Sequence, residues 1–344
     1  MSNMPNFKEV IQTKDYDFLQ TNPHLGENIA LLGLGGSYAY GTNVETSDVD
    51  IRGIATNTAD ELLTNDDFEQ VTHKATDTTI YSINKIIGLL SNCNPNVIEI
   101  LGLKPEQYLY INPFGQYLLN HKHLFLSKIA VHSFGGYANS QLRRLDNKAV
   151  RTVEQARQEA HILNSMRHAI DALPEGMRVY IDKAETPDLD DEIYFDANLT
   201  HYSLRKFHGH MSDLQNVLRD YYKLGTRNQK AIEHAKLGKH MMHLVRLYLM
   251  CMDILLKEEI NTYRDDPEEH KLLMSIREGA FLDENQQPIP EFEKLVDSLS
   301  DRLDYAKEHT HLPERVDINK IKQLKKNINL AIITKDLNYL KPIA

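Results

Sequence analysis

Short apolar runs separated by glycine, proline and polar residues dominate the first hundred residues, a pattern typical of strands joined by turns. Residues 29–34 are apolar throughout, and residues 69–75 and 77–81 are rich in threonine, valine, isoleucine and tyrosine. Residues 82–90 have apolar side chains at helical spacing. This part of the chain is therefore expected to be a sheet with flanking helices.

From about residue 127 onward the apolar residues recur at intervals of three and four, which predicts helices. The candidates are residues 129–145, 150–170, 229–257, 288–306 and 317–333. Residues 174–200 are acidic and are expected to be a loop or a hairpin. The predicted organisation is an α+β domain over residues 1–125 and an all-helical domain over residues 126–344.

Two acidic residues follow the first apolar run, in the segment 31–55, LLGLGGSYAYGTNVETSDVDIRGIA. If Asp48 and Asp50 lie on a strand, both side chains point to one face, and Val49 and Ile51 point to the other. Carboxylates so close together repel each other and need a cation or a shared proton. Mg²⁺ fits, because it binds few protein carboxylates and completes its shell with phosphate oxygens and water.

A glycine turn, Gly35-Gly36-Ser37, lies between the apolar run and this acidic pair. Glycine permits positive φ angles and close approach of a ligand to the backbone. A helix that begins at Ser37 would direct its free N–H groups toward the same space and bind phosphate oxygens. A phosphate cradle beside two carboxylates predicts a site for a metal–nucleoside triphosphate.

The order Gly36-Ser37, ten residues, then Asp48-Val49-Asp50-Ile51 resembles the motif of the DNA polymerase β superfamily of nucleotidyltransferases. Together with the segments DTTIYSINKII and NPNVIEIL, it resembles the minimal nucleotidyltransferase family associated with predicted RNA-repair systems. The resemblance implies a nucleotidyltransferase fold, a small mixed β-sheet flanked by helices. It also implies that Gly36 and Ser37 bind the β- and γ-phosphates of the nucleotide.

A third carboxylate on a neighbouring strand completes the metal site in such enzymes, and the resemblance assigns this role to Asp77, with Glu69 and Asp67 as fallback candidates. The implied site binds two metal ions. Asp48, Asp50 and Asp77 would be both the catalytic residues and the metal ligands. Arg52 is expected on the same face as the acidic pair, where it pairs with these carboxylates or with phosphate.

A row of basic residues lies in the predicted helix 229–257, at steps of three and four that place them along one face. These are Lys236, Lys239 or His240, His243 and Arg246. Cations on a largely apolar helix need anions or water nearby. They are expected to border the cleft and bind the triphosphate or the acceptor. The alternative is salt bridges to acidic neighbours such as Glu233.

Composition narrows the class of protein further. The chain has 344 residues, 41% of them hydrophobic, and a formal net charge of -10, so RNA binding would need a local basic groove. Two distant cysteines and the lack of an apolar leader predict a soluble cytoplasmic protein. Residues 241–256, the longest apolar segment, are too short to span a bilayer, so no membrane contact is expected.

The expected reaction is Mg²⁺-dependent, or Mn²⁺-dependent, transfer of a nucleoside monophosphate from a nucleoside triphosphate such as ATP to an acceptor hydroxyl. The resemblance favours the 3′ end of an RNA, for example a tRNA-like molecule, with release of pyrophosphate. Two alternatives remain, nucleotidylation of a protein and a non-catalytic nucleotide sensor. The sequence indicates neither the preferred base nor the oligomeric state.

Overall fold

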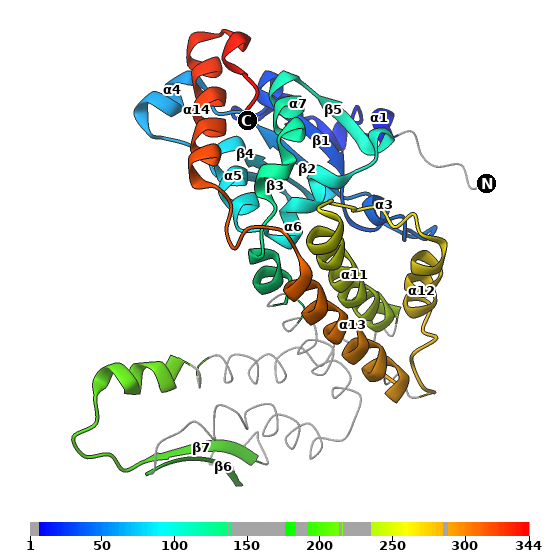
Figure 1. The fold of residues 1–344 in the computed structure, drawn as a ribbon, viewed down its shortest axis with the longest axis vertical. Helices are drawn as coiled ribbons and strands as arrows, with labels where there is room; N and C mark the ends of the chain where they lie inside the picture. The colour runs from blue at the N-terminus through cyan, green and yellow to red at the C-terminus, as the bar shows by residue number, and fades with distance from the viewer. Residues whose placement is uncertain are drawn as a thin grey trace. The chain divides into compact units, whose positions relative to one another are not determined.

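The computed structural model describes residues 7–135, 138, 176–183, 191–212, 215, 235–284 and 288–343 (Figure 1). The chain forms two compact units, one of Met1–Arg143 with Leu237–Ala344 and the other of Arg144–Lys236. This division differs from the predicted boundary after residue 125, because the C-terminal helices pack with the sheet. Helix α14 (Ile318–Thr334), for example, contacts α4 (Ala59–Thr64) and α5 (Ile83–Ser91).

A five-stranded mixed sheet is the centre of the first unit, as predicted. Its order is β3-β4-β2-β1-β5; β2 and β4 are parallel, and the other neighbours are antiparallel. The strands are β1 (Ile29–Leu34), β2 (Ile51–Ala55), β3 (Gln70–His73), β4 (Thr78–Ser82) and β5 (Tyr108–Ile111). The α+β nucleotidyltransferase fold class is therefore confirmed.

Each face of the sheet is covered by different segments. On one face the buried residues Leu32, Leu34, Ile51 and Ile80 pack with Tyr16 and Leu19. The last two come from η1 (Lys14–Tyr16) and α2 (Phe18–Thr21), which follow α1 (Phe7–Val10). Because side chains alternate along a strand, Leu31 points to the opposite face. There Gly115 of α7 (Pro113–Asn120) lies so close to β1 that a Cβ atom would be 2.3 Å from the Ala30 carbonyl oxygen.

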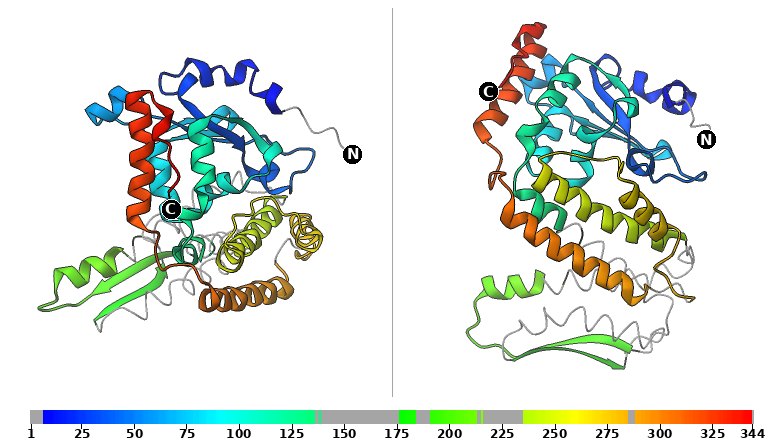
Figure 2. Two further views of the ribbon diagram at one scale, coloured as in Figure 1. Left: turned by 45° about the horizontal axis from the view of Figure 1, so that its top comes forward. Right: turned by 45° about the vertical axis from the view of Figure 1, so that its right-hand side comes forward.

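Helices complete the first unit, as Figure 2 shows from two further directions. The short elements are η2 (Gly26–Asn28), α3 (Gly36–Tyr40), η3 (Lys74–Thr76), α6 (Pro95–Ile98), η4 (Glu99–Gly102), η5 (Pro105–Gln107), η6 (Lys122–Phe125) and η7 (Leu337–Tyr339). The longer C-terminal helices are α11 (Ala235–Lys257), α12 (Pro267–Arg277), α13 (Pro290–His309) and α14. No helix among the described residues combines the length and apolarity needed to cross a membrane.

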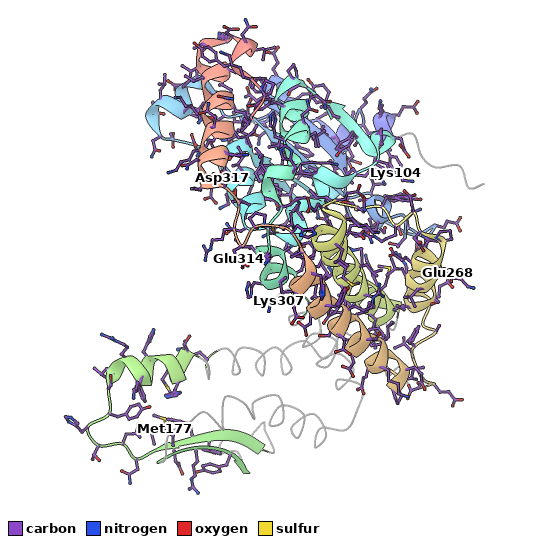
Figure 3. The ribbon with its side chains drawn as sticks, in the orientation of Figure 1. Lys104, Met177, Glu268, Lys307, Glu314 and Asp317 are labelled. Atoms are coloured by element: carbon purple, nitrogen blue, oxygen red, sulfur yellow. The ribbon has the colours of Figure 1, made fainter. Side chains whose placement is uncertain are left out.

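The polar caps of these helices follow from the sequence. Asp317 caps α14 by accepting hydrogen bonds from the backbone amides of Asn319 and Lys320, and Glu268 lies in the first turn of α12 (Figure 3). Carboxylates favour helix N-termini because the unpaired amides and the helix dipole attract negative charge. Such ends explain why the terminal helices are recognisable from the sequence.

In the second unit, the acidic segment forms a hairpin, one of the two predicted alternatives. Strand β6 (Met177–Lys183) pairs antiparallel with β7 (Asp191–Ala197). The predicted all-helical region 126–344 therefore also contains strands. The predicted helix 150–170 lies outside the described residues, as does most of the second half of the predicted helix 129–145.

Strand β5 and helix α7 are absent from the sequence-based prediction. Strand β5 has four residues and lies at the edge of the sheet, so its short apolar pattern is weak. Helix α7 has a recognisable beginning, because Asn112 accepts hydrogen bonds from the amides of Phe114 and Gly115, and Pro113 occupies the first turn.

Candidate active site

The parallel pairing of β2 with β4 brings two predicted site residues together. Ile51 is the register partner of Thr78, so Asp50 and Asp77, each one residue earlier, lie beside each other at the N-terminal ends of these two inner strands. The acidic pair was expected on a strand, whereas β2 begins only at Ile51. The segment before it is nevertheless extended enough for the Asp50 carbonyl to accept a 2.8 Å hydrogen bond from the Gly35 amide.

The expected alternation holds at this segment. Val49 packs against the apolar core together with Ile51, whereas Asp48 is exposed and Asp50 half-buried. Val49 thus anchors the segment, and the acidic side chains are left outside the core.

The glycine turn contacts the Asp50 carboxylate directly. Gly36 has a φ of 55°, and a Cβ atom there would lie 1.7 Å from Asp50 Oδ2. At Gly35 a Cβ atom would be 3.3 Å from the Asp50 Cβ. Helix α3 begins at Gly36, one residue before the predicted Ser37, and Ser37 is buried. The first amides of α3 lack acceptors within the helix, so they lie beside Asp50 with hydrogen-bonding capacity to spare.

The electrostatics of the site centre on Asp50. Its pKa is raised to about 6, first by burial and then by the negative charge of Asp77, while Arg52 and Lys239 act in the opposite direction. Arg52 donates a 2.5 Å hydrogen bond to the Asp77 carbonyl, and its Nη2 lies 3.5 Å from Asp77 Oδ1. The interpretation of Arg52 as a partner of these carboxylates agrees with this geometry.

Two carboxylates at this site, Asp50 and Asp77, are suitable ligands for a hard divalent cation. Among the residues that the structure describes, no three histidine, cysteine, aspartate or glutamate side chains converge into a ready-made metal cluster. Asp50 and Asp77, however, are two carboxylates whose repulsion a cation would relieve. Mg²⁺ commonly binds through one or two carboxylates plus substrate phosphates and water. The pair therefore suits a cation that is bound together with a nucleotide.

The two fallback carboxylates are engaged elsewhere. Glu69 pairs with Lys85 at 2.9 Å, and Asp67 accepts a 2.8 Å hydrogen bond from Asn84. Asp77 is the one of the three that interacts with Asp50, which supports its choice as the third carboxylate.

The basic residues along one face of α11 differ in how far they are exposed to solvent. Lys239 is exposed and close enough to Asp50 to lower its pKa. Arg246, in contrast, is 1% exposed; its Nη1 lies 3.6 Å from Glu99 Oε2, and its guanidinium covers the Tyr40 ring at 3.5 Å. Arg246 therefore forms a salt bridge, as the alternative interpretation expected, but its partner is Glu99.

His243 lies between Lys239 and Arg246 on the helix. Its Nδ1 accepts a 3.1 Å hydrogen bond from Arg246. The side chain of Lys236 and all of Glu233 lie outside the described residues.

Sequence reasoning did not single out Glu99 or Tyr40. The signal available for Glu99 is a carboxylate inside an otherwise apolar run, and Glu99 is in fact buried. The Tyr40 hydroxyl donates a 2.7 Å hydrogen bond to Glu99 Oε2. Tyr40 ends the helix that begins at Gly36, Glu99 lies within the motif segment NPNVIEIL, and both side chains are buried.

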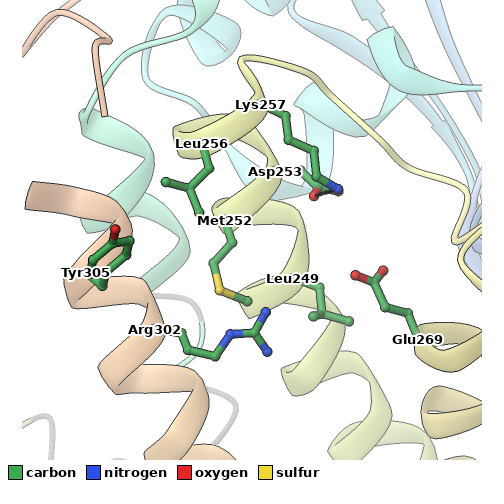
Figure 4. A pocket seen from close by; sticks show the side chains of 8 residues that line it. All are labelled: Leu249, Met252, Asp253, Leu256, Lys257, Glu269, Arg302 and Tyr305. Carbon is green, nitrogen blue, oxygen red and sulfur yellow. Dashed lines mark ion pairs between the residues drawn. The ribbon is translucent and has the colours of Figure 1, made fainter. Parts of the chain in front are cut away.

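A separate cavity of about 300 Å³ lies among α11, α12 and α13, lined by residues such as Leu249, Asp253, Arg302 and Tyr305 (Figure 4). Asp253 pairs there with Lys257 at 2.8 Å. None of the lining residues is a predicted site residue, so this cavity is distinct from the carboxylate site.

The mixed sheet, with two carboxylates beside a glycine turn, is consistent with the nucleotidyltransferase fold. Residues 7–170 match the model of the RNA repair pathway DNA polymerase beta family (RlaP). This match supports a DNA polymerase β-like nucleotidyltransferase related to RNA repair systems over this part of the chain, and the resemblance stated from the sequence is confirmed. The chain has no significant match among curated proteins or among solved structures.

The raised pKa of Asp50 predicts a pH-dependent gain in stability for Asp50→Asn. Burial disfavours the ionised carboxylate, so this group stabilises the fold below its ordinary pKa of 3.8, and the contribution is lost as the pH rises through about 6. Asparagine cannot ionise. In EDTA at pH 7.5 the free energy of unfolding of the variant should exceed that of the wild type by about 1 kcal/mol. This value is smaller than the full pKa shift would give, because Asp50 is partly exposed to solvent.

Thermal unfolding at pH 5 and pH 7.5 measures this difference. The gain in stability over the wild type should be larger at pH 7.5 than at pH 5. A gain that is equal at both pH values would contradict the assignment.

Proposed function

We propose that the protein transfers a nucleoside monophosphate from a nucleoside triphosphate to the 3′ hydroxyl of an RNA, in a reaction that depends on Mg²⁺ or Mn²⁺. The observation that supports this most is the placement of Asp50 beside Asp77, directly against the Gly35–Ser37 turn. The family match adds the relation to RNA repair.

Asp48, Asp50 and Asp77 would hold the metal ions, which when bound supply positive charge that acidifies the acceptor hydroxyl and neutralises the leaving phosphates. The backbone amides at Gly36 and Ser37 would orient the β- and γ-phosphates. The acceptor oxygen then forms a bond to the α-phosphorus, the bond from that phosphorus to the bridging oxygen breaks, and pyrophosphate leaves. Asp77 would receive the acceptor proton, and the hydrogen bond from Arg52 to the Asp77 carbonyl would help to hold it in position.

Lys239 and His243 would contact the phosphates from α11. Lys239 has the exposure and proximity to Asp50 that this role requires. Lys236, one turn earlier, is proposed as a further contact on the sequence spacing alone. We assign Arg246 to the support of this face, because its guanidinium is buried against Glu99.

Transfer of label from each of the four α-³²P nucleoside triphosphates tests the proposal. The protein is incubated with Mg²⁺ and an RNA that ends in a 3′ hydroxyl, and the label is followed by gel electrophoresis. We expect labelled RNA with the α-labelled nucleotide and none with a γ-labelled one. An RNA that ends in a 3′ phosphate is the matched control and should remain unlabelled.

Two other outcomes would contradict the RNA proposal. Label on protein would indicate nucleotidylation of a protein. Nucleotide binding without transfer to either acceptor would indicate a sensor module.

A further inference from the structure

Glu99 is a buried carboxylate that the proposed reaction does not use. It lies at the start of η4, is 6% exposed, and pairs with Arg246 and Tyr40. A buried ion pair is weak evidence for stability, since the cost of removing two charges from water can exceed their mutual attraction. The orientation that Glu99 imposes on its two partners explains the pair better than stability does.

The partners of Glu99 belong to the two helices that border the carboxylate site. Tyr40 is the last residue of α3, the helix that begins at the glycine turn. Arg246 lies in α11, and its other amino group donates to His243, one turn nearer to Lys239. Glu99 thus joins the phosphate-facing turn to the basic face of α11.

The chain after α11 is held to the same place by its backbone. The Thr262 hydroxyl donates a 2.7 Å hydrogen bond to the Glu99 carbonyl, and the Arg264 amide donates a 3.2 Å hydrogen bond to the Tyr40 carbonyl. At Gly102 a Cβ atom would lie 2.1 Å from the Ile260 carbonyl oxygen. These contacts hold the chain at the C-terminal end of α11 against η4 and α3, and the Glu99–Arg246 pair is a further contact within the helix.

We infer that Glu99 is a positioning residue for nucleotide binding: through Arg246 and Tyr40 it holds α11 against α3, so that Lys239 and His243 face the Asp50 site. This inference rests on the proposed function. Phosphate contacts from Lys239 and His243 are made before and during transfer, so their misplacement raises KM more than it lowers kcat.

The test is Glu99→Gln, because glutamine still accepts the Tyr40 hydrogen bond but leaves Arg246 without an anion. We expect the KM for the Mg²⁺–nucleoside triphosphate, and the Kd by calorimetry, to rise about tenfold, with kcat within about twofold of wild type. Glu99→Asp keeps the charge and should recover part of the loss. Hydrogen exchange of the α11 amides around Lys239 should become faster.

The double variant Glu99→Gln with Arg246→Met separates positioning from stability. It removes both buried charges, so its melting temperature should recover toward wild type while the KM stays high. Asp253→Asn is the matched control: it breaks a second buried pair on α11, with Arg264 at 2.8 Å, at the end remote from Lys239. It should lower the melting temperature without raising KM (Figure 4 shows Asp253).

A KM and a Kd of Glu99→Gln equal to wild type would overturn the inference and leave the proposed function intact. Recovery of KM together with melting temperature in the double variant would also overturn it. A wild-type protein that binds no nucleotide would overturn both the inference and the proposed function.

Discussion

Replacement of Asp50 by alanine should reduce the proposed nucleotidyl transfer by at least about a thousandfold, because the proposed metal site would stabilise charge on both the attacking and the leaving oxygens. Asp50 interacts with Asp77 and lies against Gly36. Its loss removes the carboxylate that lies between Asp77 and the glycine turn. Transfer of label from an α-³²P nucleotide, with circular dichroism to establish the fold, measures the effect.

Asp48→Ala is expected to give a comparable loss, since Asp48 is one of the three carboxylates that would hold the metal ions under the proposed function. Glu45→Ala is the matched control, because Glu45 is an exposed carboxylate in the same loop. It should retain wild-type transfer. Wild-type rates in either aspartate variant would refute the assignment of that residue.

Gly36→Ala should have the second largest effect. Alanine at a φ of 55° costs about 1–2 kcal/mol, and its Cβ would occupy the position of Asp50 Oδ2. The Asp50 carboxylate must move away from the turn. We expect transfer to fall by about a hundredfold or more, since small misplacements of reacting groups have effects of this size. Single-turnover transfer and urea unfolding measure the two consequences.

Gly88→Ala is the matched control for this change. Gly88 lies in α5, where an added Cβ meets no atom within 4 Å. Alanine also has the higher helix propensity, so the control should be neutral or slightly more stable with unchanged transfer. If Gly36→Ala behaved like this control, the close contact between the turn and Asp50 would have no functional role.

Much of the sheet is predictable from local pattern. Strands β1 and β4 and helix α5 lie within a residue or two of the expected ranges, because an apolar run or a helical period is a property of a short segment. Only the resemblance predicts Asp77 near the acidic pair, since its position beside Asp50 is not a property of either segment alone. That position follows physically from the parallel pairing of Ile51 with Thr78.

The division of the chain was harder to predict. Helix α14 packs on α4 and α5 of the sheet domain, and Tyr117 in α7 donates a 2.7 Å hydrogen bond to the Lys341 carbonyl. No local signal encodes such contacts, because they join segments that are more than 200 residues apart in the sequence. A boundary drawn where strands give way to helices therefore differs from the observed one.

Local spacing within one segment is enough to predict the acidic pair, the glycine turn and the basic face of α11. Tertiary structure alone decided which basic residue faces the acids: Lys239 is exposed near Asp50, whereas Arg246, two turns later, is buried against Glu99. Helical spacing places both on one face, but burial depends on what packs there. A carboxylate from η4 occupies that place, and only the folded chain brings it to Arg246.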